Sequence, residues 1–131
     1  MTAHRIKVLV VDDDKPTREL FCRELISAGY TVRAALDGLH AIRHMEETQF
    51  HVVLTDFDMP RMDGLELLVE IRNRWPETRV VVHSNVLREE VTQLAMLEGA
   101  YACLTKPDKT AQLLETMAAV SSAAPVSESR K

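Results

Sequence analysis

Four acidic residues stand where short apolar runs of the sequence end. Asp12 and Asp13 directly follow one run, and Asp56 and Asp58 come at the end of another. Two unit charges about 4 Å apart repel by roughly 4 kcal/mol at an effective dielectric near 20, so clustered carboxylates require protons or a cation. Mg²⁺ and Mn²⁺ prefer oxygen ligands, and Mg²⁺ completes its shell with water and phosphate oxygens. These residues predict a divalent metal site, provided that both runs end at the same edge of the fold.

Two further polar residues, Ser84 and Lys106, end two later apolar runs. With a metal ion they complete the parts of a phosphoryl-transfer centre. Asp56 would be the carboxylate nucleophile, Lys106 would neutralise phosphoryl oxygens together with the metal, and Ser84 would donate a hydrogen bond. A single aspartate after a strand is ordinarily a turn or N-cap residue. Polar residues at several successive strand ends favour a site.

The elements that must position these residues are five short strands. The apolar runs lie at 7–11, 31–35, 51–55, 79–83 and 101–104, and amphipathic stretches with helical spacing lie between them. Runs rich in Val with little polar alternation are typical of strands that are covered on both faces. This order predicts an α/β fold of five β-α units, with an open parallel five-stranded sheet and helices on both faces. Ligands of such sheets bind outside the carboxyl ends of the strands, which is where the polar residues stand.

Gly, Asp and Pro mark the helix boundaries. Gly29 is expected to close the first helix and Gly99 the fourth. Asp37-Gly38 and Asp63-Gly64 are expected to open the second and third, and Trp75-Pro76 to stop the third.

The composition is that of one ordinary globular domain. The chain has 131 residues, of which 46% are hydrophobic and 27% charged. We expect a domain at 1–120 and a disordered tail or truncated linker at 121–131. The net charge of −4 argues against nucleic acid as a direct partner, and no apolar run approaches the roughly 18 residues of a membrane span. Cys22 and Cys103 form no CxxC pair, so free thiols in a reducing cytoplasm are expected.

Three segments of the sequence carry the resemblance to a known family. They are Val8–Asp14 (VLVVDDD), Val53–Leu65 (VLTDFDMPRMDGL) and Gly99–Pro107 (GAYACLTKP). Together they resemble the receiver domain of two-component response regulators, of which the bacterial chemotaxis regulator is the minimal example. The resemblance covers roughly residues 5 to 120, and its middle segment is highly specific. It implies the flavodoxin-like version of the predicted fold.

The resemblance implies a role for each acidic residue. Asp56 matches the phosphoaccepting aspartate of the family. Asp13 matches a direct metal ligand, and Asp12 an acidic residue that acts mainly through water. Asp58 stands at the position whose backbone carbonyl completes the metal site. The implied cofactor is Mg²⁺ or Mn²⁺.

The remaining implied roles concern the switch and the partners. Ser84 matches the switch hydroxyl, and Lys106 matches the lysine that pairs with the phosphoryl group and precedes a cis peptide bond to Pro107. The phosphoryl donor would be a histidine kinase or a histidine phosphotransfer protein. The signal would pass to a downstream protein or an output domain, and a homodimer is compatible with such a role. Such a chain catalyses only its own phosphorylation and dephosphorylation.

Three residues depart from the common pattern of the family and put the usual output coupling in doubt. Asn85 replaces a small residue after the switch hydroxyl, Cys103 replaces an aromatic residue, and Asp108 replaces a Phe after the Lys-Pro pair.

Alternatives from other classes remain open at this point. Asp56-Phe57-Asp58 also resembles the first motif of haloacid-dehalogenase-type phosphatases, although that motif usually opens the domain. A phosphorylation-independent interaction module is a third possibility. His40 and His44, with Glu47 nearby, could hold zinc from one helix face, but the zincin signature is absent and an exposed helix face is the expected explanation. His83 should point away from Ser84 by strand alternation, toward core packing or a helix contact.

Overall fold

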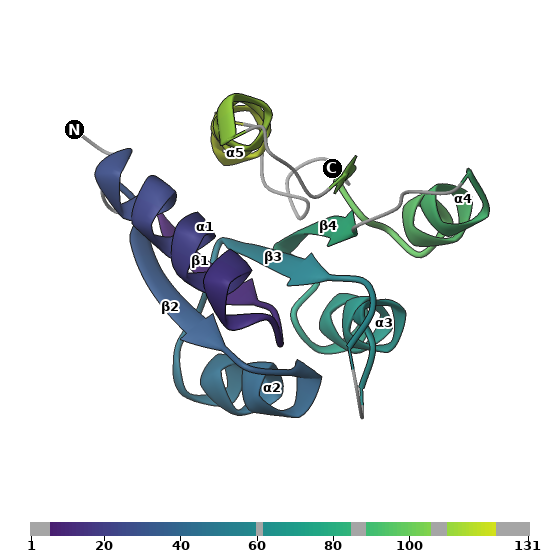
Figure 1. Ribbon diagram of the computed structural model, residues 1–131. Coiled ribbons are helices and arrows are strands. Elements are labelled where there is room, and N and C mark those ends of the chain that lie inside the picture. Colours follow the sequence, from purple (N-terminus) through teal and green to yellow (C-terminus); the bar gives the residue numbers. More distant parts are fainter. Residues whose placement is uncertain (1–5, 60–61, 85–88, 106–109, 123–131) are drawn as a thin grey trace.

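The structure, a computed structural model, describes residues 6–59, 62–84, 89–105 and 110–122. Within them, strands and helices alternate strictly, as predicted (Figure 1). The elements are β1 (Lys7–Val11), α1 (Lys15–Ser27), β2 (Thr31–Ala35), α2 (Gly38–Glu47), β3 (Val52–Asp56), α3 (Gly64–Arg74), β4 (Arg79–Ser84), α4 (Glu89–Leu97), β5 (Ala102–Thr105) and α5 (Thr110–Ser122). No helix of these ranges is long and apolar enough to cross a membrane.

The strands form one sheet in the order β2-β1-β3-β4-β5, and every pair is parallel. Figure 1 shows α1 and α5 on one face of the sheet and α2, α3 and α4 on the other. The predicted α/β fold is therefore confirmed. The strand order reverses at β1, which lies between β2 and β3. In such sheets the crevice for a ligand opens at the reversal, here at the carboxyl ends of β1 and β3.

Each face of the sheet has its own hydrophobic core, because successive residues of a strand point to opposite faces. In β1, Leu9 and Val11 pack toward α2, α3 and α4, and Val8 and Val10 pack toward α1 and α5. All four side chains have 0% exposure, so β1 is covered on both sides. Helix residues that complete the two cores include Ala41, Met45, Leu67, Leu68, Ile71 and Ala95 on the first face and Phe21, Leu25, Leu113, Met117 and Val120 on the second.

Three aspartates near the carboxyl edge are helix N-caps. The side chain of Asp14 accepts a hydrogen bond from the backbone N–H of Thr17 at 3.1 Å and caps α1. The side chain of Asp37 accepts a backbone N–H at the start of α2. Asp63 accepts from the backbone N–H of Glu66 at 2.9 Å, and the Glu66 carboxylate accepts from the Asp63 N–H at 3.1 Å, which completes a capping box. These carboxylates satisfy amides at the start of a helix. Their structural role separates them from the acidic residues of the candidate site.

We expect Asp63→Ala to lower the free energy of unfolding by about 1 kcal/mol, since the substitution removes the N-cap acceptor. Asp63→Asn keeps an acceptor oxygen and should cost less. Urea unfolding followed by circular dichroism measures both variants. If Asp63→Ala unfolds at the same urea concentration as the unmodified chain, the capping box does not contribute to stability.

Candidate functional site

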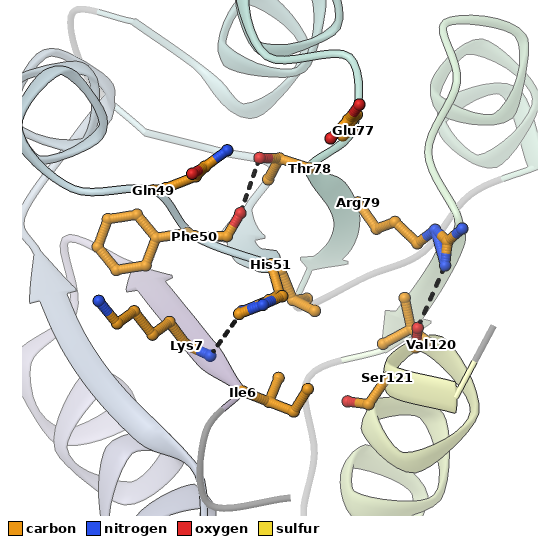
Figure 2. A pocket seen from close by; sticks show the side chains of 11 residues that line it. Ile6, Lys7, Gln49, Phe50, His51, Glu77, Thr78, Arg79, Val120 and Ser121 are labelled. Atoms are coloured by element: carbon orange, nitrogen blue, oxygen red, sulfur yellow. Dashed lines mark hydrogen bonds between the residues drawn. The ribbon is translucent and has the colours of Figure 1, made fainter. Parts of the chain in front are cut away.

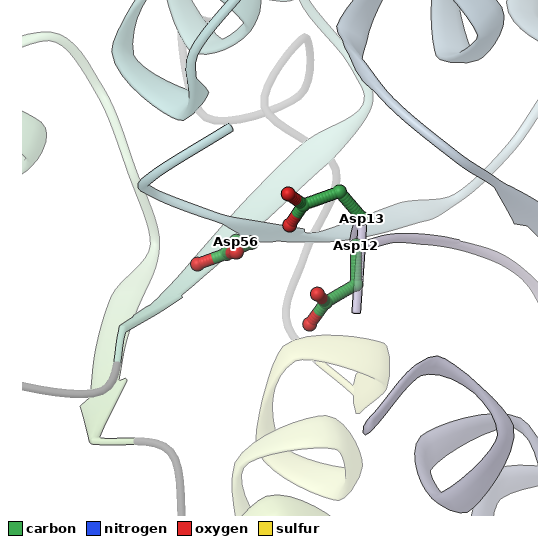
Figure 3. Close-up of side chains that lie close together, drawn as sticks. All are labelled: Asp12, Asp13 and Asp56. Atoms are coloured by element: carbon green, nitrogen blue, oxygen red, sulfur yellow. The ribbon is translucent and has the colours of Figure 1, made fainter. Parts of the chain in front are cut away.

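The side chains of Asp12, Asp13 and Asp56 meet at the carboxyl edge of the sheet. One carboxylate oxygen from each lies within 4.8 Å of the others. Asp12 and Asp56 are buried, with 0% and 4% exposure, whereas Asp13 is exposed. Figure 3 shows the three side chains close together, with the Asp13 carboxylate directed toward the Asp56 side and the Asp12 carboxylate toward the α5 side. The predicted convergence of the β1 and β3 ends is confirmed for these three residues.

Asp56 is held by the backbone around it. It is the last residue of β3 and pairs in register with His83 of β4. Gly64 begins α3 directly against it: a Cβ at this position would overlap the Asp56 carbonyl oxygen, and the Gly64 N–H donates to the Phe57 carbonyl at 2.8 Å. The start of α3 therefore approaches the end of β3 more closely than a residue with a side chain would allow.

Asp12 is fixed at its backbone and at its side chain. Its Oδ1 accepts a hydrogen bond from the Asp14 N–H at 2.8 Å, and its backbone carbonyl accepts one from the Arg18 guanidinium at 2.9 Å. Its Oδ2 lies 3.6 Å from Nε2 of His83, and both side chains are buried. The His83 ring also meets the Phe21 ring edge-on, with 4.9 Å between centroids. The predicted helix contact of His83 is thus confirmed, but its contact with Asp12 was not predicted.

Ser84 and Asp58 lie together beside Asp56. The Ser84 hydroxyl, which is buried, donates to Oδ2 of the exposed Asp58 over 3.4 Å. The Asp58 N–H donates to Oδ1 of Asp56 at 3.3 Å. The structure therefore brings Ser84 to the Asp56 side of the cluster through Asp58. The predicted roles of Lys106 and its peptide bond to Pro107, and the departures at Asn85 and Asp108, lie outside the described residues.

The donor set fits a hard divalent cation. Three carboxylates supply only oxygen atoms, and two of them are buried, so their mutual repulsion calls for a positive charge among them. In the described part of the chain this is the one group of three or more acidic, His or Cys side chains with such spacing. A site of this kind leaves room for water and for oxygens of a phosphoryl group in the shell of the metal.

A family model for the response regulator receiver domain matches residues 8–118. The chain belongs to this family. The fold around the three carboxylates is therefore that of a receiver domain, and phosphorylation on Asp is characteristic of such domains. These similarities give no support to a phosphatase of the haloacid-dehalogenase type or to a phosphorylation-independent module.

This receiver is similar to proteins of very different length. It is 38% identical over 112 residues to the sensor histidine kinase RcsC of Salmonella typhi. The matched segment covers 85% of this chain but only 12% of RcsC. The structure of the chemotaxis protein CheY4 of Vibrio cholerae matches with a TM-score of 0.83 at 32% identity, covering 88% of this chain and 98% of that one. The response regulator TrrA of Thermotoga maritima, solved in complex with Mg²⁺ and BeF, matches with a TM-score of 0.81 at 26% identity over 88% of this chain and 98% of that one.

The histidine pair on α2 of the receiver does not have the geometry of a zinc site. The rings of His40 and His44 lie 4.7 Å apart between centroids. The backbone N–H of Leu36 donates to Nδ1 of His40 at 3.0 Å, so the neutral His40 ring carries its proton on Nε2 and has no lone pair left for a metal. Desolvation, and secondarily the neighbouring His40, lower the pKa of His44. Both histidines are half-buried, so this helix face is less exposed than the sequence predicted.

Cys103 of the receiver is a half-buried thiol in β5 that packs against the core under α3 and α4. Burial raises the pKa of this thiol, so it stays protonated near neutral pH and is a poor nucleophile. Its contacts are those of a small core residue.

A hollow of about 450 Å³ lies at the amino edge of the receiver sheet, opposite the acidic cluster (Figure 2). His51 lies within it, and its Nδ1 accepts the Lys7 N–H at 3.0 Å. Figure 2 shows the Lys7 and Arg79 side chains extending to opposite sides, and Arg79 donates to the Val120 carbonyl. Its basic groups do not converge, so the hollow is not an anion site. The three clustered carboxylates lie at the other, carboxyl edge of the sheet.

Proposed function

We propose that this receiver accepts a phosphoryl group on Asp56, with Mg²⁺ or Mn²⁺ held at the acidic cluster. The observation that supports this most directly is the convergence of Asp12, Asp13 and Asp56 at the point where the sheet order reverses. Asp56 combines a buried backbone with a carboxylate at the edge of the sheet. It is the one member of the cluster that also accepts a hydrogen bond from Asp58, next to the hydroxyl of Ser84.

The proposed reaction is a transfer between two covalent phosphoryl carriers. A carboxylate oxygen of Asp56 attacks the phosphorus of a phosphohistidine, the P–N bond breaks, and the leaving imidazole keeps the electron pair and takes up a proton. Asp56 then carries an acyl phosphate. Asp13 and Asp56 would hold the metal directly, with Asp12 acting through water and Asp58 through its backbone carbonyl. When bound, the metal neutralises charge on the phosphoryl oxygens.

Ser84 is the proposed switch residue, and Lys106 is proposed to pair with the phosphoryl group. The Ser84 hydroxyl bonds Asp58 over 3.4 Å, which is a long hydrogen bond. A phosphoryl group on Asp56 would offer this hydroxyl a stronger, charged acceptor. Movement of Ser84 toward it would pull on the segment between β4 and α4 and change the surface formed by α4, β5 and α5.

The proposed phosphoryl donor is a histidine kinase or a histidine phosphotransfer protein. The signal is proposed to pass on to a downstream protein or an output domain. The similarity to a sensor histidine kinase and to a chemotaxis protein supports such partners. We place the reaction in the cytoplasm. We propose that this domain does not bind nucleic acid directly, because its net charge is −4. Self-association into a homodimer is compatible with this function.

The test is phosphorylation by a small-molecule donor. Incubation with acetyl phosphate and Mg²⁺ should add one phosphoryl group, measured as the intact mass, and chelation of the metal with EDTA should prevent it. A chain that gains no mass under these conditions, or that turns over p-nitrophenyl phosphate repeatedly, does not have the proposed function.

We expect Asp58→Asn to shorten the lifetime of the phosphorylated state by up to about fivefold, corresponding to about 1 kcal/mol. The exposed Asp58 carboxylate lies beside Asp56, and its charge disfavours the approach of an attacking hydroxide or polarised water. The decay of the labelled mass after removal of acetyl phosphate measures this rate. Asp63→Asn, which changes an N-cap carboxylate, is the matched control. Complete loss of labelling in Asp58→Asn would instead show that its side chain is a direct metal ligand.

A further inference from the structure

His83 is a buried histidine whose position links two parts of the candidate site. It has 1% exposure and precedes Ser84 in β4. Its ring packs edge-on against Phe21 of α1, which fixes the ring plane from the helix side. Its Nε2 faces Oδ2 of Asp12 at 3.6 Å. No step of the proposed phosphoryl transfer uses this side chain.

His83 lies against one oxygen of the Asp12 carboxylate. The other oxygen, Oδ1, accepts the Asp14 N–H at 2.8 Å, whereas Oδ2 faces a ring nitrogen of His83 beyond hydrogen-bond distance. A distance of 3.6 Å is longer than an ordinary hydrogen bond, so a proton on Nε2 would act on the oxygen as a nearby dipole. Groups that orient acidic side chains in this way tune the affinity of a metal site without touching the metal.

From this geometry we infer that His83 is a positioning residue of the metal site, which holds the Asp12 carboxylate through its Nε2–H. The inference rests on the proposed function, since it assigns a metal to the cluster. Strand β4 then contacts the site through two successive residues. His83 faces Asp12, and the Ser84 hydroxyl donates to Asp58. Metal binding at the end of β1 is thereby communicated to the strand that carries the switch hydroxyl.

Two amide substitutions separate positioning from simple core filling. The amide nitrogen of Gln reaches about as far from the backbone as Nε2 of His, whereas that of Asn reaches about as far as Nδ1. We expect His83→Asn to weaken Mn²⁺ binding by about tenfold and His83→Gln to stay close to the unmodified chain. Titration of Mn²⁺ followed by electron paramagnetic resonance measures the affinities. Unchanged affinity in His83→Asn, or equal weakening in both variants, overturns the inference.

Two controls distinguish failure of this inference from failure of the proposed function. Asp13→Asn should weaken Mn²⁺ binding, and His51→Asn, at the opposite edge of the sheet, should not. If Asp13→Asn binds Mn²⁺ normally, the metal site itself is misplaced, and the proposed function fails with it. If Asp13→Asn weakens binding and His83→Asn does not, only the role of His83 is wrong.

A measurement on the unmodified chain covers the case in which His83→Asn does not fold. Nitrogen-15 NMR of the histidine rings should show a proton on Nε2 of His83, and addition of Mg²⁺ should shift this resonance. A His83 ring with its proton only on Nδ1 overturns the inference. So does a His83 ring whose resonances do not change with Mg²⁺ while the backbone amide resonance of Asp13 does.

Discussion

Asp56→Asn should gain no phosphoryl group from acetyl phosphate and Mg²⁺, because the substitution removes the carboxylate that attacks phosphorus. The fold should persist, since Asn has nearly the same shape and the backbone contacts of residue 56 with Gly64 do not involve the side chain. Intact-mass measurement of the treated variant checks the loss, and circular dichroism checks the fold.

The matched control for this result is Asp14→Asn. Asp14 stands next to the cluster in sequence, but its side chain caps α1 by accepting from Thr17. We expect it to be labelled like the unmodified chain. A single phosphoryl group that persists in Asp56→Asn would place the acceptor elsewhere, and peptide mapping of that product would identify the residue.

Asp13→Asn should weaken Mg²⁺ binding by at least about tenfold, and by more than Asp12→Asn does. Asp13 is the exposed member of the cluster and is proposed to bind the metal directly, whereas Asp12 is buried and held by its own hydrogen bonds. The ligands must be ionised, so the affinity of the unmodified chain should also fall as the solution is acidified. Isothermal titration calorimetry measures these affinities. Equal binding by both variants and the unmodified chain places the metal at another site.

Much of the fold follows from local patterns in the sequence. The apolar runs, the Asp-Gly openings of α2 and α3, and Gly29 after α1 all mark real boundaries, because each depends on neighbouring residues alone. Three strands begin or end one residue later than expected: β3 covers Val52–Asp56, β4 ends at Ser84, and β5 covers Ala102–Thr105. The pairing of each strand with its neighbour fixes these ends, and this pairing is not a local property.

The candidate site was predictable only where it depends on the edge of a parallel sheet. Asp12, Asp13 and Asp56 come together because β1 and β3 are neighbours that end at the same level. The contact between Asp12 and His83 joins β1 to β4, which are separated in the sheet by β3. No pattern within a segment signals such a contact, and only the twist and packing of the whole sheet reveal it.

The order of the strands also has a consequence for how the receiver acquires its function during folding. Val8 of β1 pairs with Val32, 24 residues further along the chain, and with Val52, 44 residues further along. Closing the longer loop costs about 0.5 kcal/mol more chain entropy. Pairs that close shorter loops, β1 with β2 and β3 with β4, have a kinetic advantage over the pairing of β1 with β3. The acidic cluster needs that last pairing, so the chain can form most of its secondary structure before it has a place for a phosphoryl group. Competence to receive a signal is therefore tied to the completion of folding.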